Sequence, residues 1–467
     1  MIRRATLPRS LPALAGLAGF GTVAAASVFG LQLHPTASSR LAVRASHAHH
    51  LPVRRMPVPM RPILDPARSA VRADAARITN DGQLVRVAVT LRDRAGQPLA
   101  GEPVALLPSR RFMAGATGRT GRDGRVTLVS FVAVGARHQQ GSAGPVLLPV
   151  RDLRAGVVLP GVPQLTVYNR VAVLVQGLGT NLHCRDTACL PGMFGPLVAA
   201  VLRPLGYGAG TTPTILSYSY RGGGMALLDG SWRWRPREYD RCDTIQRVEG
   251  SARSLRAMLL GYRAHYPYTT FELIGHSLGG LVAFQAAGYP VFLGRLGPAG
   301  IDTLVTIDSP VNGITGFRAR TWLVDALAGQ WELRGCSGQR WGVPLLAELR
   351  RIGGRAPVRQ HQWAAALRAA GTAVLTATNS ADIPVPEPYA IVDDGRRRSV
   401  VDRLRLTNAS GADLGHSGLL HLRAGHGHRN PAWSGFTGQI RAYLAQPCLA
   451  FAPSSSVCRY PSLDGGF

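Results

Sequence analysis

The sequence predicts an α/β fold, with a mainly parallel sheet flanked by helices, preceded by an all-β sandwich domain. From residue 169 onward, short apolar runs alternate with segments of helical periodicity, which is typical of a parallel sheet covered on both faces. Residues 71–168 instead combine alternating strands with glycine-rich turns, which favours a sandwich. The chain has 467 residues, enough for two or three domains.

The N-terminal segment 1–33 is interpreted as a signal peptide or a membrane anchor. Three arginines within the first ten residues precede an uncharged run over 11–33, and Ala24–Ala26 offers a cleavage site. The run is also long enough to span a bilayer uncleaved. Both outcomes predict an extracellular or cell-surface protein, with cleavage slightly favoured. Residues 34–70, rich in Pro, Arg and His, predict a linker.

The formal net charge of +27 comes entirely from arginine on the basic side, since the sequence contains no lysine. We favour genome-wide codon bias as the explanation of this arginine content and charge. The alternative is attraction to an anionic membrane or cell-wall surface. No nucleic-acid partner is expected, because no binding module is present and the arginines are scattered along the chain.

Six cysteines fit an exported chain, and none forms a CxxC pair, so we expect disulfides and no metal site. Their spacing suggests two local clips and one long-range bridge, which is one of about fifteen possible pairings. The pairs suggested are Cys184–Cys189, Cys448–Cys458 and Cys242–Cys336.

The all-β region has its strongest strand signal at 84–93. Val85, Val87, Val89 and Leu91 alternate with polar or small residues, which predicts one buried face. A second strand is expected within 121–131, after an Asp-Gly turn.

The turns of this region resemble bacterial Ig-like domains of the invasin type. The residues that carry the resemblance are Asp93, Gly96, Pro98, Gly101, Val104 and the pair Asp123-Gly124. The resemblance implies a spacer or adhesion module, and no chemistry is assigned to it.

The α/β region, 169–447, is expected to alternate regularly. Strands are predicted at 171–175, 214–220, 271–275, 302–308, 372–378 and 398–406. Helices are predicted at 196–206, 243–267, 278–288, 361–371 and from Asn430-Pro431 to Leu444. Asp243 is the predicted N-cap of the second helix, whose buried face should hold Ile245, Val248, Ala252, Leu255 and Leu259.

The segment "GHSLGG" (275–280) places Ser277 between an apolar strand and an apolar helix. This strand-turn-helix setting is that of a nucleophile elbow, where a strained turn projects the serine hydroxyl above the sheet. Glycines at 275, 279 and 280 would let strand and helix cross closely.

The motif "IGHSLGG" and the earlier "VLVQGLGTN" (173–181) resemble the α/β-hydrolase family, lipases and esterases in particular. The resemblance covers residues 169–447. It implies a serine, an acid and a histidine in that chain order. It also implies an acyl-enzyme, without a metal or an organic cofactor.

His416 is the predicted base. It lies in a second "GHS", 139 residues after Ser277, behind the last predicted strand. A serine needs such a base, because its hydroxyl is a poor nucleophile at neutral pH. Ser417 is interpreted as structural. Rival histidines lie in the same loop, at His421, His426 and His428.

Asp382 in "TNSADIPVP" is the predicted acid, since the imidazole needs a buried carboxylate to orient it. It follows Ser277 by 105 residues (382 − 277) and precedes His416 by 34 (416 − 382). Asp308 is the alternative acid, because some family members take the acid from one strand earlier.

The oxyanion hole is expected to use backbone N–H groups. Leu278, directly after the nucleophile, should supply one, and Leu178 the other, with Gly179 as the alternative. Many relatives have His-Gly where this chain has Gln176-Gly177, but a backbone donor does not depend on that side chain.

Residues 311–360 are either a cap or lid over the site, or part of an ordinary core. Their apolar residues include Trp322, Trp331, Trp341, Leu345 and Leu346. Residues 448–467 form a C-terminal tail.

These residues predict a secreted serine hydrolase that cleaves carboxylic esters, with a lipid or another apolar ester as substrate. One alternative is an acyltransferase with the same triad. Another, from a different class, is a surface adhesion protein with an inactive hydrolase domain.

Overall fold

The computed structural model describes most of residues 62–379 and, beyond them, 385, 390, 402–406, 436–441 and 444. Within the first range the gaps are 75, 81–83, 109–114, 132–142, 160–163, 185–188, 191, 209–213, 298–299, 314–335 and 337–342. Several expectations lie outside the described residues. They are the signal segment, nearly all of the linker, the tail with Cys448 and Cys458, and Asp382, His416, His421, His426 and His428.

The described residues between 62 and 159 form strands as their only regular elements. One antiparallel sheet has the order β1 (Ala70–Ala73), β3 (Leu84–Thr90), β6 (Arg125–Phe131). The other has the order β5 (Ala116–Arg119), β4 (Pro103–Leu106), β8 (Val150–Asp152). Val85, Val87 and Val89 are buried and alternate with exposed residues, which confirms the predicted face. The Ig-like assignment stays a prediction.

Turns with positive φ join these strands where the sequence predicted them. Gly96 has φ +81°, and Gly124 has φ +73°. A Cβ atom at Gly124 would lie 2.6 Å from the Leu91 carbonyl oxygen, so only glycine fits there.

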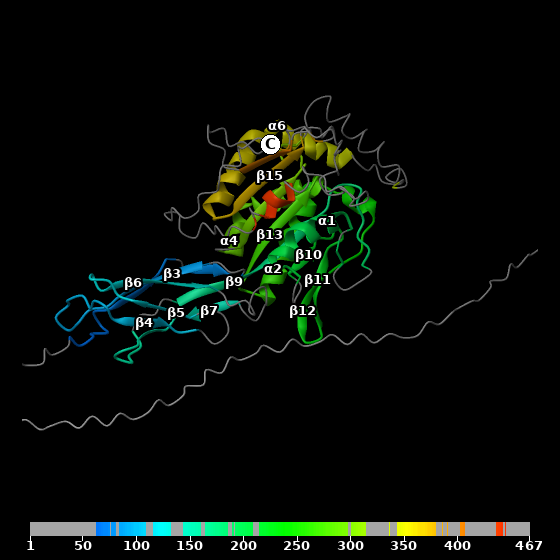
Figure 1. The fold of residues 1–467 in the computed structure, drawn as a ribbon. Coiled ribbons are helices and arrows are strands. Elements are labelled where there is room, and N and C mark those ends of the chain that lie inside the picture. Colours follow the sequence, from blue (N-terminus) through cyan, green and yellow to red (C-terminus); the bar gives the residue numbers. More distant parts are fainter. Residues whose placement is uncertain are drawn as a thin grey trace, which may run out of the picture. The chain divides into compact units, whose positions relative to one another are not determined.

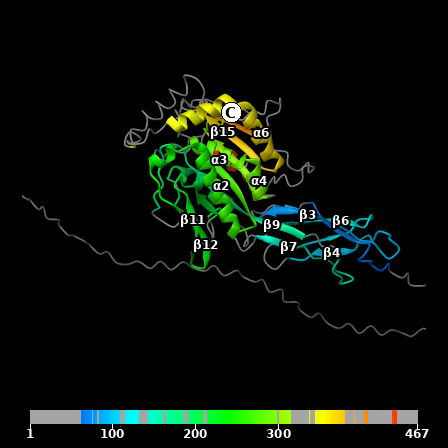
Figure 2. The ribbon, with the colours of Figure 1, turned by 180° about the vertical axis from the view of Figure 1, so that it is seen from behind.

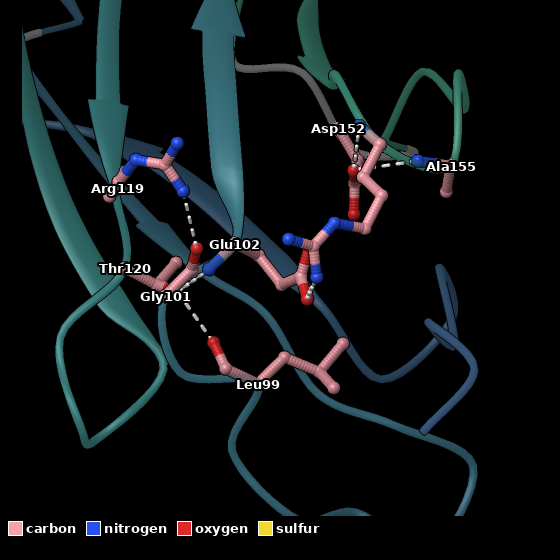
Figure 3. A network of polar contacts seen from close by, with 8 residues as sticks. Leu99, Gly101, Glu102, Arg119, Thr120, Asp152 and Ala155 are labelled. Atoms are coloured by element: carbon pink, nitrogen blue, oxygen red, sulfur yellow. Dashed lines mark hydrogen bonds and ion pairs between the residues drawn. The ribbon is translucent and has the colours of Figure 1, made fainter. Parts of the chain in front are cut away.

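A polar network ties the strands of the β5-β4-β8 sheet together (Figure 3). The Thr120 hydroxyl accepts the Glu102 N–H at 2.9 Å and donates to the Leu99 carbonyl at 2.5 Å. The Glu102 carboxylate in turn receives Arg154 Nη1 at 2.9 Å, and the Asp152 carboxylate caps the Arg154 N–H. These bonds satisfy the Thr120 hydroxyl and one Glu102 carboxylate oxygen at the strand ends.

Strand β9 (Gln164–Val175) runs across the position where the pattern of the sequence changes. Its first half pairs with β2 (Arg77–Thr79) and β7 (Gly144–Leu147). Its second half pairs in parallel with β10 and β13. One continuous strand therefore belongs to both regions.

The mainly parallel sheet is confirmed (Figure 1). Its strands pair in parallel throughout the path from β10 to β16. Their order is β10 (Ile215–Ser217), β9, β13 (Thr269–His276), β14 (Ile301–Ile307), β15 (Ala373–Asn379), β16 (Asp402–Leu406). Their carboxyl ends therefore meet at one edge, which is where ligands bind in open α/β sheets.

Helices cover both faces of this sheet. Residues of α2 (Val248–His265), α3 (Leu278–Ala287), α4 (Pro290–Leu296) and α6 (Val343–Ala369) bury one face, which Figure 2 shows from behind. The other face packs against α1 (Gly195–Leu197), the turns that follow it, η4 (Val198–Leu202) and η5 (Arg203–Leu205), and Phe436, Ile440 and Leu444. Successive strand residues alternate between the two cores, as in Val173 and Leu174.

The N-cap prediction for Asp243 is wrong. Residues Arg241–Ile245 form a short 3₁₀ helix, η6, which Asp240 caps. The Asp243 carboxylate in turn accepts a hydrogen bond from the Asp240 N–H. Helix α2 begins only at Val248. The capping box belongs to the preceding turn, since Gln246 is extended and ends η6. The predicted apolar face of α2 itself is buried as expected.

The helix predicted at 361–371 is also corrected, because α6 already begins at Val343. The Gly353-Gly354 pair and Pro357 are helix-breaking signals, but Leu345 and Leu349 are buried in the core and hold the first turns in place. Leu345 is thus a core residue. The other apolar residues named for the cap, apart from Leu346, lie outside the described residues.

Two of the suggested disulfides are present, Cys184–Cys189 and Cys242–Cys336. Such bonds are compatible with export. In the part of the chain that the structure describes, every helix is too short or too polar to cross a bilayer.

A hairpin of β11 (Gly223–Leu228) and β12 (Ser231–Pro236) follows β10. It leads directly into η6, so the chain returns from the hairpin toward the edge where the strands end. The Leu182–Tyr239 bridge fixes this return.

Candidate active site

Ser277 lies on the strained turn that the sequence predicted. It follows β13, precedes α3, and has φ +55° and ψ −131°, which a non-glycine residue adopts only under strong structural constraint. Its N–H donates to the Ile307 carbonyl at 2.9 Å, and the residue is 4% exposed. The neighbouring strand therefore holds the turn.

Glycine is required on both sides of this turn. A Cβ atom at Gly279 would lie 2.2 Å from the Val175 carbonyl oxygen, and one at Gly275 would lie 2.5 Å from Gly280 Cα. These are backbone atoms that cannot rotate away. Strand, turn and helix can approach this closely only without side chains.

We predict that Gly279→Ala lowers the free energy of unfolding by about 2 kcal/mol or more, because its methyl group would overlap two carbonyl groups. Gly261→Ala in α2 is the matched control. Its Cβ would meet open space, so stability should rise by up to about 1 kcal/mol. Urea unfolding followed by tryptophan fluorescence measures both, and equal effects would contradict the close crossing.

The loop after β9 lies directly beside the serine. A Cβ atom at Gly177 would lie 2.7 Å from Ser277 Cβ and 3.2 Å from its Oγ. The Gly177 backbone therefore lies against the Ser277 side chain.

Three hydrogen bonds fix this loop. Gly179 N–H donates to Thr244 Oγ1 at 2.9 Å. The Thr180 hydroxyl donates to the Gly177 carbonyl at 2.8 Å, and the Tyr220 hydroxyl donates to the Gln176 carbonyl at 2.7 Å. Thr244 lies on η6, which is joined to Cys336 through the Cys242 disulfide.

Tyr218, Tyr220 and Tyr239 form an edge-to-face cluster beneath the loop. Burial raises the pKa of each hydroxyl above its ordinary value. The Tyr220 hydroxyl therefore stays protonated and remains a donor to the Gln176 carbonyl.

Both backbone positions expected for an oxyanion hole border the serine. Leu278 is the first residue of α3, where an N–H has no acceptor within the helix. Leu178 follows Gly177 and is 7% exposed. The Gly179 N–H donates to Thr244 Oγ1, and the assignment of the second donor to Leu178 stays a prediction.

The acid and the base are only partly described. Asp308 follows β14 at the same edge, is buried, has φ +45° and donates its N–H to the Ala377 carbonyl at 2.9 Å. Asp382 and His416 lie outside the described residues. The strands before them, β15 and β16, pair with each other up to Asn379 and Leu406, and β15 also pairs with β14, so all three strands end at the same edge of the sheet.

Sequence reasoning missed the residues that support the loop. Thr244, Tyr220 and Tyr239 lie 44 or more residues from Gln176, at the ends of elements whose placement no local pattern shows. The only signal was the "SYSY" run at 217–220, whose alternation marks two tyrosines for the same face.

No family model and no curated protein matches the sequence of this chain. Solved structures do resemble it. A lipase-esterase related protein from Clostridium acetobutylicum has 12% identity, covers 59% of this chain and 94% of its own, and has a TM-score of 0.34. 2-Hydroxy-6-oxo-6-phenylhexa-2,4-dienoate hydrolase from Rhodococcus sp. strain RHA1 has 14% identity. It covers 65% of this chain and 96% of its own, with a TM-score of 0.34.

The adhesin InvE of Yersinia pseudotuberculosis is also similar, with 21% identity over 25% of this chain and 33% of its own, and a TM-score of 0.19. At these identities and TM-scores the likenesses assign no activity to the chain. The chemistry of the site has to carry the functional conclusion.

Proposed function

We propose that this chain is a serine hydrolase of the α/β-hydrolase type that cleaves carboxylic esters. The observation that carries the proposal is Ser277 itself, held at φ +55° between β13 and α3 with the loop 176–180 beside its Oγ. Strain at a buried serine persists only where the surrounding structure enforces it, and such strain clusters at catalytic turns.

The proposed reaction has two stages. Ser277 Oγ attacks the ester carbonyl while His416 takes its proton, and Asp382 orients the imidazole. The N–H groups of Leu278 and Leu178 stabilise the oxyanion of the tetrahedral intermediate. His416 then protonates the leaving alkoxide. Water, deprotonated by His416, hydrolyses the acyl-enzyme and restores Ser277.

The substrate proposed is an ester with an apolar acyl chain, such as a lipid. The apolar composition of the sequence around residues 311–360 is what suggests such a substrate. We also propose that the protein acts outside the cytoplasm, which the two described disulfides support.

A fluorophosphonate probe tests the proposal, since it phosphonylates only an activated serine. We expect it to label Ser277 in the folded protein, as peptide mass analysis would show, and not after denaturation in urea. Hydrolysis of p-nitrophenyl esters of increasing acyl length then defines the chain preference. A folded protein that is not labelled would refute the catalytic function.

The acid is distinguished by two variants. We predict that Asp382→Asn lowers kcat about 10⁴-fold, because the imidazole loses the carboxylate that fixes its tautomer. Asp308→Asn should retain most of its kcat. Ester hydrolysis at saturating substrate measures both, with circular dichroism as the check on folding. The reverse result would assign the acid to Asp308.

A further inference from the structure

A cavity of about 530 Å³ lies on the face of the sheet covered by α2, α3 and α6. None of its lining residues belongs to the serine turn or to the loop 176–180. The residues that the argument uses are Glu249, Arg253, Arg256, Tyr289, Arg351 and Arg359, with Trp363 beside them. A volume of this size is that of a small-molecule site.

The lining is strongly cationic. Four arginines face a single acid, Glu249, which lies 3.6 Å from Arg253 on the solvent side. Arg351 approaches the buried Glu348 at 3.7 Å. Among the described residues, no carboxylate lies within ion-pairing distance of Arg256 or Arg359. The cavity therefore holds two guanidinium groups that form no ion pair with the carboxylates of the described residues.

Aromatic rings hold these two guanidinium groups in place. Arg256 lies 4.8 Å above the ring centre of Tyr289, and Arg359 lies 4.8 Å above that of Trp363. Trp363 is itself buried and packs on Phe284, with ring centres 6.0 Å apart. An arginine ordered by stacking loses less conformational entropy when it binds an anion.

Partial burial of the Arg256 guanidinium also favours binding of an anion. It lowers the pKa of Arg256, and the neighbouring charge of Arg253 lowers it further, while Tyr289 and Glu249 raise it. A cation that is partly removed from water and lies close to a like charge is stabilised by a counter-ion.

We propose that this cavity binds the phosphate group of a ligand, with Arg256 and Arg359 as its principal contacts. Guanidinium groups fit phosphate through paired N–H donors, and arginines from α2 and α6 approach from two sides. Bare phosphate would fill only part of the cavity, so the group belongs to a larger molecule, either a soluble phosphoester or a phospholipid headgroup. The proposal does not depend on the function of Ser277.

The test measures binding of inorganic phosphate to the purified protein by isothermal titration calorimetry at constant ionic strength. We expect saturable binding, and an affinity at least about tenfold lower in Arg256→Gln/Arg359→Gln, since hydrogen bonds to charged groups are lost. Arg125→Gln/Arg151→Gln is the matched control. It removes the same charge from exposed positions of the β region and should leave the affinity unchanged.

Two further probes identify the source of the phosphate. Glycerol 3-phosphate represents soluble phosphoesters, and vesicles of phosphatidylglycerol, compared with phosphatidylcholine, represent lipid headgroups. Tighter binding of either probe that is lost in the Arg256/Arg359 variant supports the site. The proposal is overturned if phosphate does not bind, or if both double variants bind it equally, because the overall charge would then explain the binding. Ester hydrolysis should stay unchanged in both variants.

Discussion

Replacing Ser277 with alanine is expected to lower the kcat for ester hydrolysis by about 10⁴- to 10⁶-fold. The loss should be this large because the proposed acyl-enzyme forms on Ser277 Oγ, and no other atom of the described turn can replace it. The KM should change little, since the substrate would still contact the loop 176–180 and Leu278. Initial rates on a p-nitrophenyl ester measure both constants.

Ser309→Ala provides the matched control for this variant. Ser309 is also buried, also follows a strand end at this edge, and donates its hydroxyl to the Ile307 carbonyl at 2.9 Å. Its removal deletes a hydroxyl of the same kind without touching the proposed nucleophile, so most activity should remain. If both variants lost activity equally, the effect would come from disturbing the edge of the sheet.

The serine turn could be predicted from sequence because its determinants are local. An apolar strand, a serine between glycines and an apolar helix lie within about twenty residues, and each glycine is required by a backbone approach that the structure shows. The parallel sheet was predictable for a similar reason, since its strands are buried on both faces and appear as continuous apolar runs.

The helices show where local reasoning fails. Asp243 and Gln246 have the spacing of a capping box, but the capping pair is Asp240 and Asp243 around a shorter turn. The middle of α6 contains two glycines and a proline, and the helix continues through them with buried core residues on both sides. Tertiary contacts decided both cases, and the sequence does not display them.

The supports of the site were unpredictable for the same reason. Thr244 acts on Gly179 from 65 residues away, and Tyr220 acts on Gln176 from 44. The cationic cavity likewise joins Arg256 and Arg359, which are 103 residues apart (359 − 256). In a chain with this many arginines, nothing in the sequence marks those two.

A buried ionic cluster links three neighbouring strands of the parallel sheet, β9, β13 and β14. Arg170 on β9 pairs with Glu272 on β13 and, at 3.0 Å, with Asp302 on β14. All three residues are at most 5% exposed. The Tyr207 hydroxyl donates to Glu272 at 2.5 Å, and Arg170 Nη1 donates to the Leu444 carbonyl at 2.9 Å.

Arg170→Met is expected to lower the free energy of unfolding by about 3–5 kcal/mol, because it leaves two carboxylates buried without their counter-ion. Urea unfolding followed by tryptophan fluorescence is a suitable measurement. All seven tryptophans lie between residues 232 and 433, so the signal reports the α/β region and not the β region.

Replacing the whole cluster separates the effect of unpaired buried carboxylates from the effect of lost packing. In Arg170→Met/Glu272→Leu/Asp302→Leu no charge of the cluster remains, so at least half of the lost stability should return. Arg221→Gln is the control. Its contact with Asp243 is 3.9 Å long and its side chain is 60% exposed, so it should cost less than about 1 kcal/mol. A triple variant that is less stable than Arg170→Met would show that the cluster itself, rather than the isolated carboxylates, stabilises the sheet.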